Sequence, residues 1–220
     1  DQKIGKIIPF IQKTADTRDA ALADVVLELT TVLEKAHPGE AKPLSAAGDL
    51  LYYTGRKKEA LVKYQRALEL DKAVFAVWEQ AMIIHCENGR YEALLRLSEN
   101  ALDYFPNRAM AHYFNALALL ETGRPDDAEG VVEQALLMIG KDQQAASLLL
   151  GVKAGIAYAR KKYPAGDVLF DEAIKQNPGS AELLARYSLA LLARNEFADK
   201  AWEMAQKADK LSPGNVTVDH

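Results

Sequence analysis

A few side chains in this chain of 220 residues have the types and spacing that nucleophilic or metal chemistry would need. Cys86 is the single cysteine and follows His85 directly, and His112 lies further along the chain. A thiol next to an imidazole could form a nucleophile and its base, and two histidines could bind zinc. Adjacent helix positions, however, point about 100° apart, and two histidines leave a tetrahedral zinc site incomplete. We therefore interpret the two histidines as packing residues, and we expect no catalytic site, metal site or cofactor.

The clustered charges also have simpler explanations than catalysis or phosphate binding. Asp126 and Asp127 follow Pro125, which is typical of a first helical turn, because the helix dipole favours carboxylates there. The basic turns at 56–58 and 160–162 are isolated, and the 27 basic and 31 acidic residues give a net charge of −4. Nucleic acid needs a clustered basic face, so we expect no nucleic-acid partner. No apolar run reaches the roughly 18 residues of a membrane span.

The sequence pattern of the helices expected to carry these residues repeats every 34 residues. The period is carried by glycines, by large side chains and by alanines, namely Gly55, Gly89 and Gly123, then Leu44, Trp78 and His112, then Ala67, Ala101 and Ala135. Such a period is typical of helix–turn–helix units that cannot bury their apolar faces alone. Apolar residues recur three and four apart and no segment alternates with period two, which predicts an all-α chain.

Local signals place the ends of these helices. Gly55, Gly89 and Gly123 are expected to end the first helix of each unit, because glycine adopts the left-handed conformation without strain. The period lengthens by four residues near 142–146, which is about one helical turn. We therefore predict that Asp142 caps a first helix that is one turn longer than the others.

The residues around the landmarks also show which family the chain resembles. In residues 41–74, Leu44 fills an opening aromatic position, Ala47-Gly48 a Leu-Gly pair, and Ala60 with Tyr64 an A-x3-F element. This pattern resembles the tetratricopeptide-repeat family, although Lys72 stands where proline is usual. Related patterns recur in four more segments, 75–108, 109–142, 147–180 and 181–215. The resemblance implies a right-handed superhelical solenoid of antiparallel helix pairs.

The two ends of the chain are expected to differ from the central repeats. Residues 1–40 contain apolar stripes and read as N-terminal helices, either a degenerate repeat or a cap. The stripes comprise Ile4, Ile7, Ile8 and Ile11, then Leu22, Val25, Val26, Leu29 and Leu33. Residues 216–220 could open a further repeat, and the first residue is Asp1. We expect the sequence to be a piece of a longer repeat array.

The resemblance also implies where a partner would bind, because first helices line the concave groove in this family. The expected groove residues lie at spacing i, i+4, i+7 on each first helix: Ser45, Asp49 and Tyr52; Glu79, Ile83 and Cys86; Tyr113, Leu117 and Leu120; Gly151, Gly155 and Tyr158; Ala185, Leu189 and Leu192. The alternative is that these groups pack on neighbouring helices of the same chain. Gly151 and Gly155 would form the deepest part of the groove or, alternatively, a tight internal helix contact.

The residue types at these groove positions also indicate which class of ligand we expect. Relatives that clamp a terminal carboxylate use lysine, asparagine and arginine here, whereas Asp49 and Glu79 would repel that ligand. The mixture of tyrosine and aliphatic groups favours an extended peptide or an amphipathic helix. We expect a non-catalytic protein–protein interaction scaffold that forms a module of a longer protein. The alternative is self-assembly or intramolecular docking through the ends of the repeat array.

Overall fold

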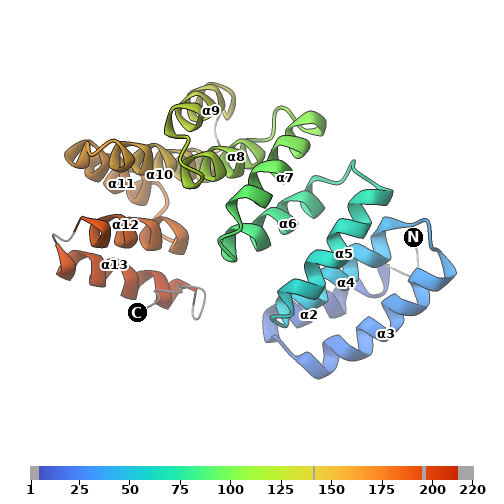
Figure 1. The fold of residues 1–220 in the computed structure, drawn as a ribbon. Coiled ribbons are helices and arrows are strands. Elements are labelled where there is room, and N and C mark those ends of the chain that lie inside the picture. Colours follow the sequence, from blue (N-terminus) through green and yellow to red (C-terminus); the bar gives the residue numbers. More distant parts are fainter. Residues whose placement is uncertain (1–4, 141, 195–196, 213–220) are drawn as a thin grey trace. The chain divides into compact units, whose positions relative to one another are not determined.

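The computed structural model describes residues 5–140, 142–194 and 197–212, and their regular structure is helical, with no strand in those ranges. The chain divides into two compact units, residues 1–88 and 89–220. The first unit contains α2 (Ile8–Thr17), α3 (Ala20–Ala36), α4 (Ala41–Tyr53), α5 (Lys57–Leu70) and α6 (Phe75–Glu87). The second contains α7 (Tyr91–Tyr104), α8 (Ala109–Glu121), α9 (Pro125–Met138), α10 (Gln143–Ala159), α11 (Tyr163–Gln176), α12 (Ala181–Ala193) and α13 (Ala198–Leu211). The all-α prediction is confirmed (Figure 1).

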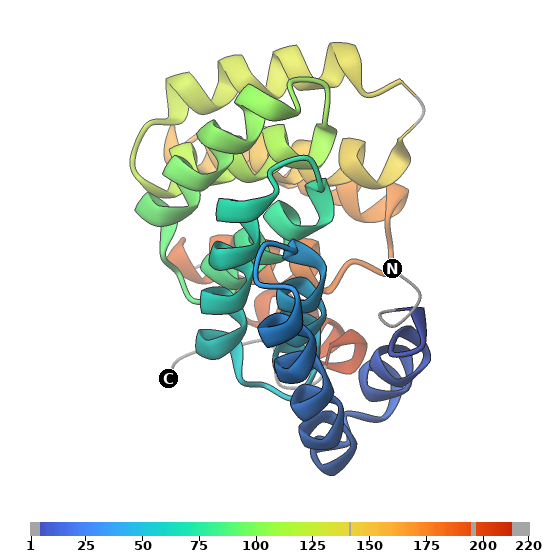
Figure 2. The ribbon, with the colours of Figure 1, turned by 90° about the vertical axis from the view of Figure 1, so that its right-hand side faces the viewer.

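Consecutive helices pack as hairpins, and each hairpin packs on the next within its unit. The pairs α4–α5, α8–α9, α10–α11 and α12–α13 make the most extensive contacts, and α2 packs on both α3 and α4 (Figures 1 and 2). In the second unit, α10 packs against both α8 and α9, and α12 packs against both α10 and α11. In the second unit, α10 and α12 are therefore each buried between their own partner and the preceding pair.

The turns between paired helices use the predicted left-handed residues. Gly55, Gly89 and Gly123 have φ of +80°, +63° and +79°, and the amide of Gly55 donates to Tyr52, as the amide of Gly123 does to Leu120. The fourth pair lacks this glycine, and Lys161 adopts positive φ at the corresponding position. In the fifth pair that position, Asn195, lies outside the described residues, and Phe197 has positive φ as the N-cap of α13. Packing of the flanking helices therefore imposes the turn even where a side chain makes it less favourable.

The longer fourth copy is also as predicted. The Asp142 carboxylate accepts a hydrogen bond from the amide of Ala145 at 3.0 Å and caps α10. Helix α10 has 17 residues, against 13 in α8 and α12. The four extra residues lengthen the helix by about one turn and leave its apolar side facing the core.

Small residues sit where paired helices approach most closely. Ala60, Ala67, Ala101 and Ala135 are fully buried. Gly48 of α4 lies against the ring of Tyr64 on α5, and a Cβ added there would meet ring carbon Cε1 at 2.5 Å. The alanine and glycine landmarks thus mark helix crossings at which a larger side chain has no space.

The N-terminal helices α2 and α3 bury only part of their apolar stripes. Ile7, Val26 and Leu33 are buried, whereas Val25 and Leu29 are exposed. Ile4 and residues 216–220 lie outside the described residues. The continuous stripe expected on α3 is therefore divided between a core face and a solvent face.

Candidate functional site: the first-helix faces

The first unit presents a half-buried, mixed face on α4 and α6. Asp49 and Tyr52 lie on α4, Glu79 and Ile83 lie on α6, and all four side chains are partly exposed. Carboxylates, a tyrosine ring and an aliphatic chain thus lie partly at the surface of one unit. Such groups can bind a peptide through apolar contact and ion pairing, and they include no nucleophile paired with a base.

Asp49 is held in place by the second helix of its pair. The Tyr64 hydroxyl of α5 donates to Asp49 Oδ1 at 2.7 Å. Burial raises the pKa of Asp49 above its usual value, and this hydrogen bond partly opposes the increase. The pKa of Tyr64 is also raised, first by its own burial and then by the neighbouring carboxylate. The carboxylate therefore has a fixed orientation and is only partly solvated.

Tyr52 links the ends of α4 and α6. Its hydroxyl donates to Glu87 Oε1 at 3.0 Å, while Glu87 Oε2 pairs with the Lys57 ammonium at 3.2 Å. Burial, with a further contribution from the Glu87 charge, raises the pKa of Tyr52, so the phenol stays protonated. These bonds keep the aromatic ring of Tyr52 at the edge of the face.

Several residues at the corresponding positions of the second unit are buried. Tyr113 and Leu117 of α8 are buried, and the Tyr113 hydroxyl donates to the Glu182 carboxylate of α12. Gly151 of α10 is also buried. The structure therefore places these three expected groove residues in the interior of the unit, because α8 and α12 meet over the adjoining face of α10.

The two glycines of α10 lie beside side chains of α12 and α8. A Cβ added to Gly151 would collide with the end of the Leu183 side chain on α12. A Cβ added to Gly155 would meet Leu120 Cδ2 at 2.7 Å and Arg186 Nη2 at 3.5 Å. Arg186 in turn pairs with Glu121 at 3.1 Å. These contacts are the ones expected from internal helix packing, the alternative to a deep open groove.

Tyr158 takes part in a polar network between repeats. Its hydroxyl donates to Asp167 of α11, which also accepts bonds from Tyr187 at 3.0 Å and Arg194 at 3.3 Å. Burial, followed by the hydrogen bond to Asp167, raises the pKa of Tyr158. The ring of Phe170 stacks on Tyr187 at 4.7 Å between centroids. Tyr158 is therefore half-buried and tied to its own chain, while Leu189 of α12 is exposed.

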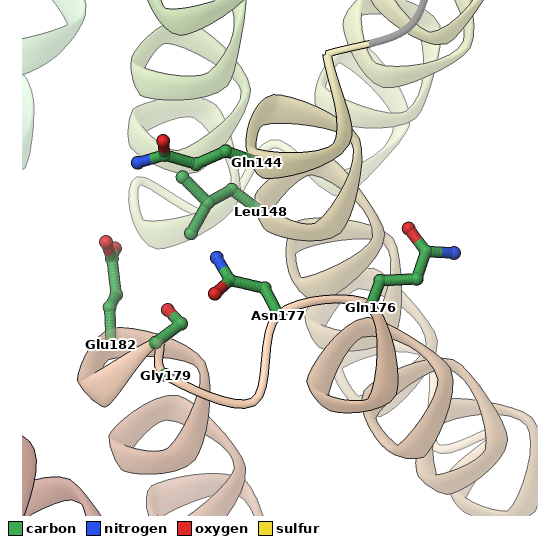
Figure 3. Close-up of a pocket in the computed structure, with 7 residues that line it drawn as sticks. Gln144, Leu148, Gln176, Asn177, Gly179 and Glu182 are labelled. Atoms are coloured by element: carbon green, nitrogen blue, oxygen red, sulfur yellow. The ribbon is translucent and has the colours of Figure 1, made fainter.

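A polar cavity that was not predicted from the sequence lies beside the α11–α12 turn. It measures about 400 Å³, and its lining includes Gln144 and Leu148 of α10, Gln176 and Asn177, Gly179, Ser180 and Glu182. Figure 3 shows Gln144, Leu148 and Asn177 directed toward the space above the turn, whereas the amide of Gln176 points away. The only sequence signal is the run of polar residues after α11, which is common to solvated turns.

The two histidines considered as metal ligands, His85 and His112, are buried. His112 Nε2 lies 2.8 Å from the carbonyl oxygen of Pro106, and His85 is buried next to the half-buried Cys86. Within residues 5–140, 142–194 and 197–212, no cluster of three or more His, Cys, Asp or Glu has the geometry of a metal site. Across the same ranges, no helix is both long and apolar enough to span a membrane.

Comparison with known proteins agrees with this architecture. A family model described as "Tetratricopeptide repeat" matches residues 86–150, and no curated protein sequence matches the chain. A tetratricopeptide repeat protein from Parabacteroides merdae is 18% identical over 97% of this chain and 95% of its own, with a TM-score of 0.67. PilF of Pseudomonas aeruginosa is 18% identical over 97% and 94%, with a TM-score of 0.62.

A third similar structure is YrrB, described as a TPR protein with an unusual peptide-binding site. It is 20% identical over 86% of this chain and 94% of its own, with a TM-score of 0.52. Identities this low show a shared fold and not a shared ligand. Taken with the 34-residue period and the helix pairs, they agree with a tetratricopeptide-repeat fold, and the family model of that name matches residues 86–150 of the chain.

Proposed function

We propose that the chain is a non-catalytic scaffold that binds a peptide or helix of another protein on the first helices of its first unit. The observation that carries this proposal is the contrast between the two units. Asp49, Tyr52, Glu79 and Ile83 are partly exposed on α4 and α6. Their counterparts on α8 and α10 are largely occupied by contacts within the chain, whereas Leu189 of α12 is exposed. The fold supports a protein-binding role, because tetratricopeptide repeats present extended surfaces to partners.

The chemistry of the face narrows the class of ligand. Asp49 and Glu79 repel a ligand that ends in a free carboxylate and attract lysine or arginine. Tyr52 and Ile83 offer apolar contact, and tyrosine is among the residues enriched at binding hot spots. A segment with basic side chains beside large apolar ones fits this combination. YrrB, according to its description, has a peptide-binding site, and a similar mode on this chain is part of the proposal.

The test is a binding screen with defined peptides. The 220-residue chain is immobilised and probed with a peptide library that includes basic–apolar sequences and sequences with acidic C-termini. We expect the basic–apolar set to be enriched and its binding to weaken at higher salt, because exposed charge pairs are screened.

Matched variants locate the site. Glu79→Gln should weaken the selected peptide by about 2- to 5-fold, since an exposed ion pair contributes up to about 1 kcal/mol. Ile83→Ala should weaken it further through lost apolar contact. Glu99→Gln removes an exposed carboxylate from α7 and serves as the control. Enrichment of peptides with acidic C-termini, or equal effects of Glu79→Gln and Glu99→Gln, would contradict the proposed site.

A further inference from the structure

The polar cavity beside the α11–α12 turn has one wall that comes from the extra turn of α10. The landmark residue of the repeat is the fourth residue of α8, His112, but the eighth residue of α10, Leu150. The four added residues include Gln144, which lines the cavity together with Leu148 one turn later. A first helix of 13 residues, like α8 or α12, would not carry Gln144. The cavity is therefore tied to the insertion in the repeat pattern.

The lining of this cavity is rich in hydrogen-bond acceptors. Glu182 supplies a carboxylate, and, as far as the structure describes the chain, no lysine or arginine lines the cavity. Gln144 and Asn177 add two carboxamides, and Figure 3 shows both directed into the space above the turn. A carboxamide can present its oxygen to a cation. Leu148 adds an apolar wall, so the lining suits a positively charged group with an apolar stem.

Glu182 is held in place by a helix from an earlier pair. The Tyr113 hydroxyl of α8 donates to Oε1 of Glu182. Tyr113 is fully buried, whereas Glu182 is partly exposed. Its second oxygen, Oε2, can therefore accept an N–H from a ligand while Oε1 stays bonded to the phenol. A carboxylate oriented in this way loses little conformational freedom when a ligand binds.

The two helix ends at the turn have opposite effects on a bound charge. Helix α11 ends at Gln176, and the partial negative charge of its last carbonyls favours a cation. Helix α12 begins at Ala181, and its first amides would favour an anion. The Ser180 hydroxyl, however, accepts from the Leu183 amide at 3.3 Å, and the Glu182 carboxylate lies in the same turn. The start of α12 is thus compensated by its own side chains, and the balance favours a cation.

We propose that this cavity binds an alkylguanidinium group, as in the side chain of arginine. A guanidinium has five N–H donors in a plane, so it can bond to the Glu182 carboxylate and to both carboxamides at once. Its weak hydration allows the methylene stem to pack on Leu148, whereas the ammonium of lysine is compact and strongly hydrated. The volume of about 400 Å³ accepts the stem as well as the charged group. The site lies in the second unit and does not depend on the proposed peptide face of α4 and α6.

The direct test titrates blocked amino acids into the isotope-labelled 220-residue chain and follows backbone amide signals by NMR. Blocked arginine should shift the signals of residues 144–148 and 176–182, and its binding should weaken at higher salt. Blocked citrulline has the shape of arginine without the charge and should cause no shift. Blocked lysine should bind more weakly than arginine. Signals of residues 49–52 and 79–83 report the proposed peptide face separately, so binding at either place can fail without the other.

Variants with matched controls identify the groups that bind. Glu182→Gln removes the charge but keeps an oxygen for the Tyr113 hydroxyl, and it should weaken blocked arginine by about 5-fold. Gln144→Ala should weaken it by about 2- to 3-fold. Glu133→Gln, exposed on α9, and Gln143→Ala, which precedes Gln144 but does not line the cavity, should bind like the parent. Circular dichroism checks that each variant is folded.

The guanidinium can come from a partner protein or from a free guanidino compound, and two further probes distinguish these sources. Butylguanidine carries the group without a peptide backbone, and blocked Ala-Arg-Ala carries it within one. Tighter binding of the tripeptide is expected for an arginine of a partner protein. Equal binding of the two is expected for a free compound.

Four results would overturn the proposal. Blocked arginine without effect on residues 144–148 and 176–182 shows that the cavity is only a solvated crevice. Citrulline that binds as well as arginine shows that charge is not recognised. Blocked glutamate that binds in place of arginine shows an anion site at the start of α12. Equal effects of Glu182→Gln and Glu133→Gln show that Glu182 does not contact the ligand.

Discussion

Replacing Gly48 with alanine tests whether helix contacts in this repeat array are limited by the size of the landmark residues. The added Cβ would lie 2.5, 2.8 and 2.9 Å from three carbon atoms of the Tyr64 ring. The ring has little freedom to move away, because Tyr64 is fully buried and its hydroxyl is bonded to Asp49. We therefore expect α4 and α5 to be forced apart or the ring to leave its preferred rotamer.

The expected change in the free energy of unfolding is the difference between two opposing effects. Overpacking of a tight site costs about 1–3 kcal/mol, whereas alanine in place of glycine inside a helix stabilises by about 1 kcal/mol. We expect the first effect to win and the free energy of unfolding to fall by up to about 2 kcal/mol, since a rigid ring and not a flexible chain end must give way. For a chain of this size each kcal/mol lowers the melting temperature by about 2–4 °C.

Gly130→Ala is the matched control on the other unit. Gly130 is exposed within α9, and an added Cβ would meet nothing within 4 Å. Only the helix propensity changes, so this variant should be more stable than the parent by up to about 1 kcal/mol. Stability changes of opposite sign in the two variants distinguish an effect of side-chain packing from an effect of helix propensity.

Denaturant unfolding is followed by tryptophan fluorescence, to which Trp78 contributes from the first unit and Trp202 from the second, and by circular dichroism, which reads both units. Repeat arrays do not always unfold in one step, so midpoints are compared for each signal separately. Gly48→Ala should cost less in a Tyr64→Leu background, because the clash partner is smaller. If Gly48→Ala has the same cost in both backgrounds, or is as stabilising as Gly130→Ala, the steric account of Gly48 is wrong.

Two further predictions concern the candidate site. Gly155→Leu should lower stability by about 1–3 kcal/mol, because the new side chain meets Leu120 and disturbs the Arg186–Glu121 pair; near-parent stability in a melting experiment would instead place Gly155 on an open surface. Asp49 has a folded-state pKa above the usual 3.8, so the folded protein holds this proton more tightly and ionisation of Asp49 lowers stability as pH rises above that value. Asp49→Asn, whose amide oxygen can still accept the Tyr64 hydroxyl, should therefore stabilise the chain at pH 7 but not below pH 3.8. A stability difference that is independent of pH would show that Asp49 ionisation is not the cause.

Hydrogen bonds and an ion pair within the first unit hold side chains of the proposed binding face in place. Asp49 is oriented by Tyr64, and Tyr52 is bonded to a glutamate that also pairs with Lys57. Side chains held in this way lose less conformational freedom when a ligand binds than free ones do. The selectivity we propose, for basic–apolar segments over acidic ends, therefore depends on fixed carboxylates and not on an adaptable surface.

Local structure followed from the sequence because its causes are local. The glycines at the helix ends, the Asp142 cap and the extra turn of α10 depend on residues a few positions apart. The 34-residue period then predicted helix pairs, since identical spacing places identical small residues at each crossing. These features were therefore predictable from the residues within each repeat.

The exposure of the first-helix faces was decided only by the tertiary structure. Leu117 and Leu189 occupy the same position in their repeats, yet one is 0% and the other 52% exposed. Gly151 and Gly155 read equally well as a groove floor and as a helix contact until Leu183 and Leu120 were placed beside them. The physical reason is that a position in a repeat fixes the direction of a side chain, while its burial depends on a neighbouring helix distant in sequence.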